Sequence, residues 1–491
     1  MLRGFAIVFA IVAVLAATVE LYLRSRERAQ WRRLEAAAER ELLAGGLRGL
    51  LRARAMALGG AAIIDDAEPA ATIALASAML ASEYGLDEVR AARVAADTVE
   101  ATPTASQRAH SLKLASRALL QVGAGHLDDA EALARQSLVM GHKQASPLFV
   151  LGRVRLRQGN LAAAGHAFQA ALVREPSFTE ARVAWAESWL EQGEPEKAKE
   201  NLLKALRYTP DHGRALLLLA EADNTAVAGK EWEAICARDE SQSPFLAGAC
   251  ALARANRSAR ADDRAETVRW AEAAARQRPS DPRVLGGAAQ VLASSGHVDQ
   301  ASSCLDEAMR IARPSLPSLR WGQLAVDLGR GRLVDLSTAA DLSAAPKLSS
   351  SPWAPALVAR NALASGGIKA LAAVVRNLPR GALQLDAFAS LVSGESRPGP
   401  TDPIRAYVDG MKARLEGKAT AAIERLAKAL QYHGDACRAA GEYLAACREL
   451  GRVPDDDALG WLRRENAHCV NLPELATSIP RPRGGAARIS H

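Results

Sequence analysis

The stretch LGRVRLRQGNLAAAGHAFQAALVREP, residues 151–176, decides the fold of this chain, because a second copy of its pattern follows at residues 185–210. The copy, WAESWLEQGEPEKAKENLLKALRYTP, keeps the residue type at nearly every aligned position. The aligned pairs are Gly152 and Ala186, Gly159 and Gly193, Ala164 and Ala198, Phe168 and Leu202, Ala171 and Ala205, and Pro176 and Pro210. Self-similarity at a fixed period, here about 34 residues, is typical of repeat architectures. We call this spacing the repeat register.

Each copy has the pattern of a helical hairpin. Apolar residues recur at three- and four-residue spacing before the central glycine, which predicts a first helix. A glycine at 159 or 193 permits the left-handed conformation that commonly ends a helix. Ala164, Phe168 and Ala171 then form the inner stripe of a second helix. The proline at 176 or 210 stops that helix.

This spacing resembles the tetratricopeptide repeat, from the small residue and the turn glycine to the final proline. Further copies with the same pattern carry Gly296 with Ala301 and Gly417 with Ala422. The resemblance implies an all-α protein, an α-solenoid of helical hairpins that extends over residues 64–334. It also implies hairpins of the same kind over 403–470, with an irregular and helical spacer that contains linkers over 335–402.

Composition favours the same fold class. Apolar residues make up 49% of the chain and charged residues 24%, which predicts a folded protein. Aromatic residues are only 4%, and strands usually favour aromatic and β-branched side chains. The tail over residues 471–491 is basic and poor in apolar residues, so we expect it to be disordered.

The net charge of +7 comes mainly from the two ends of the chain. Residues 24–55 contain nine arginines and four glutamates, and the tail from 477 onward adds three arginines. The remainder is close to neutral, whereas a protein that binds nucleic acid usually has a basic face on its folded body. We therefore expect no nucleic-acid partner.

Residues 4–23, GFAIVFAIVAVLAATVELYL, carry a single charge, Glu20. Twenty helical residues rise about 30 Å, the thickness of the hydrocarbon core of a bilayer. We therefore expect a transmembrane anchor over 1–24, with a basic juxtamembrane helical segment over 25–63. A cleaved signal peptide is the alternative. The apolar core of a signal peptide is shorter than a membrane span, and the charge-free run here, Phe5–Val19, is short enough to be such a core.

The side of the membrane stays open at this point. Five arginines directly after the predicted span place the solenoid in the cytoplasm by the positive-inside rule: Arg24, Arg26, Arg28, Arg32 and Arg33. The cysteines favour the periplasm instead. Cys236 and Cys250 flank one turn-like segment and Cys437 and Cys469 another, so two disulfides are compatible with the predicted hairpins, and these would require an oxidising compartment. The alternative is that the cysteines are small buried residues.

Motifs for catalysis or for metal and cofactor binding are not found. The nine histidines are scattered without a ligand pair at helical spacing, and there is neither a C-x-x-C pair nor a phosphate-binding loop. We expect no metal, no cofactor and no enzymatic activity.

Proteins of the resembled family bind other proteins or peptides in the groove formed by their first helices. The resemblance places Phe149, Arg153, Val183 and Glu187 on that groove. The predicted function is a non-catalytic scaffold or adaptor, single-pass in a bacterial inner membrane, that acts in envelope assembly. The alternative is a periplasmic, disulfide-containing component of a secretion, motility or polysaccharide-export machine. The oligomeric state is not specified by the sequence.

Overall fold

A computed structural model describes residues 2–64, 66–222, 231–239, 241–261, 263–277, 281–332, 353–376, 388–389, 392–393, 403–430, 436–455 and 469. Within these ranges, side chains are described from Val12 onward, except at 231–232, 235, 239, 260, 264, 364–368, 403–405 and 436. The predicted disordered tail and much of the predicted spacer lie outside these residues.

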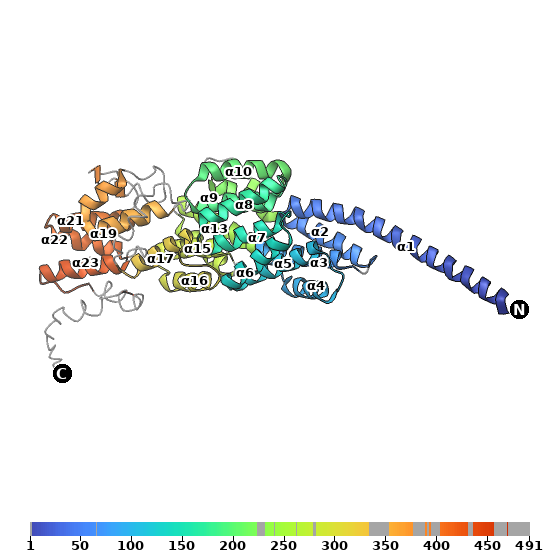
Figure 1. Cartoon of the computed structure of the whole chain (residues 1–491). Helices are drawn as coiled ribbons and strands as arrows, with labels where there is room; N and C mark the ends of the chain where they lie inside the picture. Colours follow the sequence, from blue (N-terminus) through green and yellow to red (C-terminus); the bar gives the residue numbers. More distant parts are fainter. Residues whose placement is uncertain are drawn as a thin grey trace, which may run out of the picture. The chain divides into compact units, whose positions relative to one another are not determined.

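The described chain folds as helices connected by turns, and it divides into two compact units. Unit 1 comprises residues 1–189 and 196–246, and unit 2 comprises residues 190–195 and 247–491. The expected all-α fold of helical hairpins is confirmed for the described residues (Figure 1). The domain limits proposed from sequence stay predictions.

Unit 1 contains the helices from α1 to α12, although the last two residues of α9 and the first residue of α10 belong to unit 2. These helices are α1 (Leu2–Ala44), α2 (Gly46–Ala61), α3 (Ala67–Tyr84), α4 (Val89–Ala101), α5 (Gln107–Ala124), α6 (Leu127–Met140), α7 (Ser146–Arg157), α8 (Leu161–Arg174), α9 (Thr179–Glu191), α10 (Pro195–Tyr208), α11 (Gly213–Ala222) and α12 (Glu231–Asp239).

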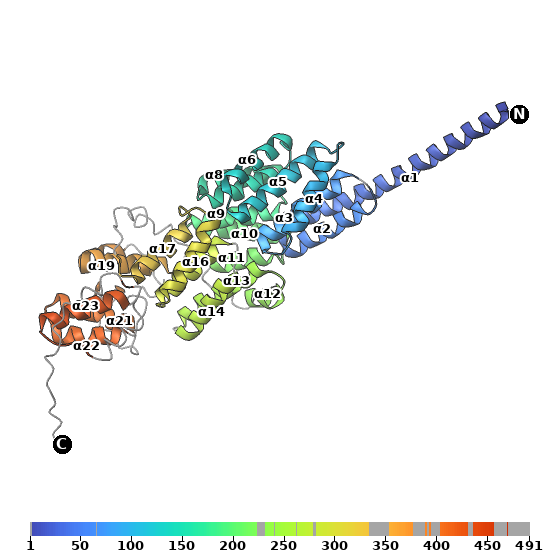
Figure 2. The same ribbon diagram turned by 90° about the horizontal axis from the view of Figure 1, so that it is seen from below.

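Unit 2 continues the helical pattern within its described residues. Its helices are α13 (Pro244–Arg260), which begins in unit 1, then α14 (Arg264–Arg276), α15 (Pro282–Ser294), α16 (Val298–Ile311), α17 (Pro317–Gly329), α19 (Ala354–Val375), α21 (Pro403–Leu415), α22 (Ala419–Ala429) and α23 (Ala436–Glu449). In both units consecutive helices pack as hairpins, as α5 does with α6, α7 with α8, and α15 with α16 (Figure 2).

The glycines of the repeat register lie in the turns of the hairpins. Gly125, Gly159 and Gly193 have φ values of 82°, 74° and 70°. A side chain is strained in this left-handed region, so glycine is the residue that fits there. Gly296 and Gly417 adopt the same conformation in unit 2. The sequence period therefore corresponds to a structural period.

Close packing inside a hairpin depends on a second glycine. A Cβ atom on Gly152 of α7 would lie 2.4 Å from the ring of Phe168 in α8. Gly410 of α21 has the same relation to Leu426 of α22, whose side chain would lie 2.7 Å from a Cβ atom on Gly410. The second-helix stripe, made of Ala164, Phe168, Ala171, Ala198, Ala205, Ala301 and Ala422, is fully buried.

The N-terminal helix differs from the prediction. Helix α1 continues without a break from the apolar segment into the arginine-rich one, and its second half packs on α2, where Trp31 covers Gly60.

Among the described residues, no helix has both the length and the apolar character needed to cross a membrane. The predicted inner-membrane location is therefore wrong on this finding. The part of the predicted span before Val12 lies outside the described side chains. The envelope-assembly role depended on that location and loses its basis.

The cysteines of unit 2 include a disulfide between Cys437 and Cys469, whose Cα atoms are 5.3 Å apart. Cys236 and Cys250 also take part in disulfide bonds. Cys304 and Cys447 are buried free thiols.

We predict that Gly152→Val lowers the free energy of unfolding by about 1–3 kcal/mol, because the added methyl groups must displace the Phe168 ring. Gly123→Ala in α5 is the matched control, since a Cβ atom there meets nothing within 4 Å. It should leave stability equal or higher. Urea denaturation followed by circular dichroism measures both variants, and equal effects would contradict the packing described.

Candidate functional site: a buried charged network in unit 1

Four charged side chains form a closed ring in the interior of unit 1. Glu83 lies in the last turn of α3, Arg153 in α7, Glu187 in α9 and Arg214 at the start of α11. Arg153 donates Nε to Glu83 Oε1 and a terminal nitrogen to Glu83 Oε2, both at 2.8 Å. Its other terminal nitrogen donates to Glu187 Oε2, also at 2.8 Å. Arg214 pairs with the same two carboxylates.

The ring contains two positive and two negative charges, so its net charge is zero. All four side chains are nearly excluded from solvent. Removing charges from water is costly, and the pairing compensates for this only when the geometry is good and all members are present. The bidentate contact of Arg153 with Glu83 is a strong form of such pairing. The ring therefore fixes the relative positions of α3, α7, α9 and α11.

Beside the ring, the carboxylate of Glu180 in α9 contacts residues of three other elements. Its Oε1 atom accepts hydrogen bonds from the backbone N–H of Gly46 at 2.8 Å and from the hydroxyl of Tyr84 at 2.6 Å. The Nε2 atom of His212 lies 3.2 Å from the same oxygen. The side chains of Tyr84, Glu180 and His212 are buried.

The contact with Gly46 supplies a helix cap that α2 lacks locally. Gly45, the residue before α2, has no side chain to accept the first N–H groups of the helix. These groups have no partner within the helix, and a negative charge near them also interacts favourably with the helix dipole. Glu180, 134 residues away in the chain, provides that charge.

The two glycines before and at the start of α2 make this contact sterically possible. Gly45 and Gly46 have φ values of 63° and 71°. A Cβ atom on Gly45 would lie 2.7 Å from Cγ of Glu180. The sequence Ala44–Gly45–Gly46 therefore allows the backbone to approach the carboxylate.

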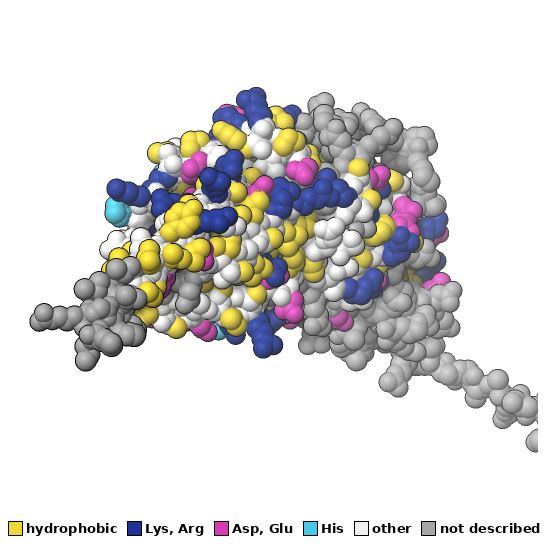
Figure 3. All heavy atoms as spheres, turned by 90° about the vertical axis from the view of Figure 1, so that its right-hand side faces the viewer, with side chains coloured by type: hydrophobic (Ala, Val, Ile, Leu, Met, Phe, Trp, Pro, Cys, Tyr) yellow, Lys and Arg dark blue, Asp and Glu magenta, His cyan; other side chains and the backbone are white. Residues whose placement is uncertain are grey.

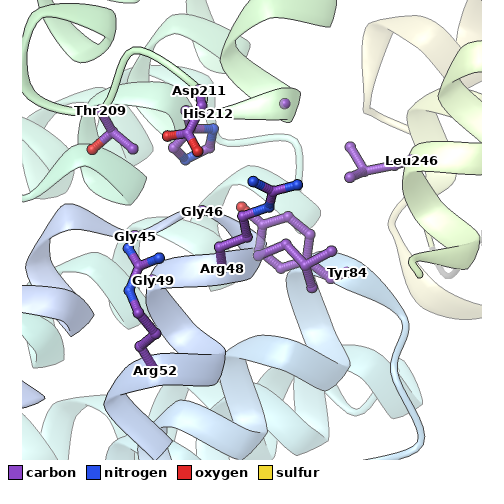
Figure 4. Close-up of a pocket in the computed structure, with 12 residues that line it drawn as sticks. Gly45, Gly46, Arg48, Gly49, Arg52, Tyr84, Thr209, Asp211, His212 and Leu246 are labelled. Carbon is purple, nitrogen blue, oxygen red and sulfur yellow. The ribbon is translucent and has the colours of Figure 1, made fainter. Parts of the chain in front are cut away.

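His212 and Thr209 hold the same backbone segment from the other side. The Nδ1 atom of His212 accepts the N–H of Ala215 at 3.2 Å and so caps α11. Thr209 donates its hydroxyl to the carbonyl oxygen of Ala44 at 2.6 Å. The starts of α2 and α11 are thus fixed by neighbouring side chains (Figure 4).

Burial alone would raise the pKa of Glu180. The charge and hydrogen bonding of His212, the charge of Arg214 and the Tyr84 hydroxyl outweigh it and lower the pKa of Glu180 to about 2. Burial raises the pKa of Tyr84 well above 10, and the charge of Glu180 adds to this effect. Glu180 is therefore an ionised acceptor at neutral pH, and Tyr84 is a neutral donor.

A cavity of about 20 Å³ adjoins these residues. Figure 4 shows Gly45, Gly46, Arg48 and Arg52 on one side of it, with Thr209, Asp211 and His212 on the other. A space of this size holds about one water molecule and excludes larger ligands. Among the residues that the structure describes, no group of three or more His, Cys, Asp or Glu side chains could hold a metal ion.

The four residues predicted to line an open groove are buried. Phe149 and Val183 are fully inaccessible, and Arg153 and Glu187 are 2% and 5% exposed. Phe149 packs against the rings of Phe168 and Phe178, with centroids 6.2 Å and 5.2 Å away. Their predicted placement on an open face is corrected, because internal contacts occupy all four side chains.

Sequence reasoning missed Glu83, Tyr84, Glu180, His212 and Arg214. One signal was available, because Arg153 and Glu187 are 34 residues apart and so carry opposite charges at the same repeat position of adjacent hairpins. Such a pair favours an interaction between neighbouring first helices. No comparable pattern identifies Glu83 or Glu180, which lie far in sequence from the residues that they contact.

Comparison with known proteins finds no matching family model and no matching curated protein. Three similar solved structures are the TPR domain of P58(IPK), Naa15/Naa10 bound to HypK-THB, and the APC/C hetero-tetramer Cut9–Hcn1. Their identities are 14%, 15% and 13%, and their TM-scores are 0.22, 0.27 and 0.31. The matches cover 75%, 80% and 91% of this chain, and 95%, 68% and 95% of the respective other chain. Similarities this weak carry no argument about partners.

We predict that Arg153→Met lowers the free energy of unfolding by about 3–5 kcal/mol, because it leaves two buried carboxylates with one cation. Lys204→Met is the matched control, since Lys204 pairs with Glu200 in solvent. Exposed pairs contribute little, so this variant should unfold like the wild type. A loss below about 1 kcal/mol in Arg153→Met would show that the ring is not a unit.

A second prediction concerns acid stability. The pKa of Glu180 lies below its ordinary value of 4.5, so its stabilising effect is complete above about pH 4.5 and is lost as the pH falls toward 2. The stability difference between wild type and Glu180→Gln should therefore be largest at neutral pH and shrink over this window. Urea denaturation at a series of pH values measures it. A difference that does not change with pH would contradict the ionised, hydrogen-bonded carboxylate.

Proposed function

We propose that the chain is a non-catalytic scaffold that binds partner proteins through the outward faces of its helical hairpins. The observation that carries this proposal is the stacking of hairpins in the repeat register, with turn glycines at equivalent positions. In such repeats each hairpin buries its inner stripe against its neighbours, so the outward residues are free to form an extended binding surface.

The outward faces carry apolar side chains at related positions. Val139 in α6 and Val173 in α8 occupy equivalent positions in consecutive hairpins, and they are 79% and 77% exposed. Tyr208 ends α10, the next second helix, and is 51% exposed. We call these three residues the apolar set. Exposed apolar residues at related positions of successive hairpins can form part of one protein interaction site.

The visible surface has a mixed character. Figure 3 shows a face on which Lys and Arg side chains lie among apolar and acidic ones. Apolar contacts surrounded by polar and charged residues are the usual composition of a protein–protein interface. This composition supports a protein partner.

Affinity purification with chemical cross-linking from the native cells tests the proposal, followed by reconstitution from purified components. We expect a stoichiometric protein partner whose cross-links fall within residues 107–208. Val139→Glu with Val173→Glu should weaken its binding at least tenfold, because charges replace apolar contacts. Val94→Glu in α4, also at an exposed position, is the matched control and should bind normally.

Either of two results would contradict the proposal. One is the recovery of no protein that re-forms a complex with the purified chain. The other is a complex whose cross-links avoid the hairpins and whose affinity is unchanged in the double variant.

A further inference from the structure

The first helices of unit 1 contact its last ones directly. In repeat solenoids, each unit usually contacts only its neighbours in the chain. Here α2 packs on α3 and also contacts α11, and α3 is joined to α9 and α11 by side-chain bonds. These contacts bypass the intervening α5–α8 hairpins and connect residues up to 165 positions apart.

The contacts that bypass these hairpins are polar, which distinguishes them from the apolar cores of the hairpins. Three of them involve the backbone: the N–H of Gly46 with Glu180, the carbonyl oxygen of Ala44 with Thr209, and the carbonyl oxygen of Tyr84 with the Ser243 hydroxyl. The others are the Tyr84–Glu180 hydrogen bond and the Glu83–Arg214 ion pair. We call these five contacts the clasp.

Steric fit restricts which residues can stand at the clasp, in addition to the hydrogen bonds and the ion pair. A Cβ atom on Gly45 would meet the Glu180 side chain at 2.7 Å, and one on Gly85 would meet the Phe245 ring at 2.3 Å. Both glycines have positive φ values. The clasp therefore closes only when the backbone at residues 44–46 and 84–85 lies directly against the side chains of Glu180 and Phe245.

The hairpins have cores of their own. Ala57 of α2 packs with Ile73 and Ala74 of α3 and with Ala95 and Ala96 of α4. Phe168 of α8 fills the space beside Gly152 of α7. None of these core contacts belongs to the clasp, although opening it over Arg153 also breaks the contact of Arg153 with Glu83.

We propose that the clasp is a gate that closes the inner face of unit 1 over Arg153, Val183 and Glu187, and that it opens without unfolding the hairpins. In the closed state these side chains are inaccessible, which is why the first helices present no open groove. The gate covers the inner face, whereas the proposed partner surface lies on the outward faces, so the existence of the gate does not depend on the scaffold function.

Native-state labelling of the full chain with N-ethylmaleimide tests the gate. Val183→Cys places a thiol on the inner face, and Ala134→Cys places one in the buried stripe of α6. Each is combined with Gly45→Ala, which wedges the clasp, or with Gly59→Ala in the same hairpin, where a Cβ atom meets nothing within 4 Å. Peptide mass spectrometry reads each site, and the buried thiol of Cys304 reports unit 2.

We expect Cys at 183 to react at least tenfold faster with Gly45→Ala than with Gly59→Ala. Cys at 134 and Cys304 should react at equal rates in both backgrounds. The gate is overturned if position 183 is unaffected by Gly45→Ala, or if positions 183 and 134 accelerate together, since the clasp would then be inseparable from the core. The experiment uses no partner, so failure of the scaffold proposal leaves its outcome unchanged.

Discussion

One carboxylate oxygen, Oε1 of Glu180, connects four elements of unit 1. It accepts the first N–H of α2 and the hydroxyl of Tyr84 at the end of α3, and it lies beside the His212 ring that caps α11. The helix that carries it, α9, is itself a first helix of the repeat register. Because α2 has no local cap, this long-range contact satisfies the first N–H group of the helix and adds to its packing on α1 and α3.

Two levels of organisation coexist in the unit. Local hairpins are determined by small residues and turn glycines, which act within one hairpin, as Gly152 and Phe168 show. The clasp and the contact of Arg153 with Glu83 act over 70 to 165 residues and are polar. Apolar packing tolerates many arrangements, whereas buried charges require one, because an unpaired charge in the interior is costly. The polar contacts thus select one curvature for the stack of hairpins.

Sequence reasoning succeeded where structure is local. The repeat register, the turns at Gly159 and Gly193 and the second-helix stripe could be derived because each depends on residues nearby in the chain. It failed for Phe149, Arg153, Val183 and Glu187, whose exposure depends on what covers the first helices. Phe168 and Phe178 cover Phe149, but Glu83 of α3 and Arg214 of α11, which pair with Arg153 and Glu187, lie outside residues 146–191. Glu180 is an acidic residue in the first turn of α9, and nothing near it in sequence indicates its distant partners.

The N-terminal segment shows a related limit. Its apolar composition was interpreted by itself, while the structure shows one helix whose second half is anchored to the protein through Trp31 and Gly60. The buried network also changes where partner binding is expected. Because Phe149, Arg153, Val183 and Glu187 are buried, the partner surface that we propose lies on the outward faces of the second helices.

A double-mutant cycle on Tyr84→Phe and Glu180→Gln tests the central claim most directly, with free energies of unfolding measured by urea denaturation at pH 7. A hydrogen bond to a charged acceptor contributes more than one to a neutral acceptor. The account predicts a coupling energy of about 1 kcal/mol or more between the two substitutions. Additivity within about 0.3 kcal/mol would contradict the claim that the Glu180 carboxylate joins these elements.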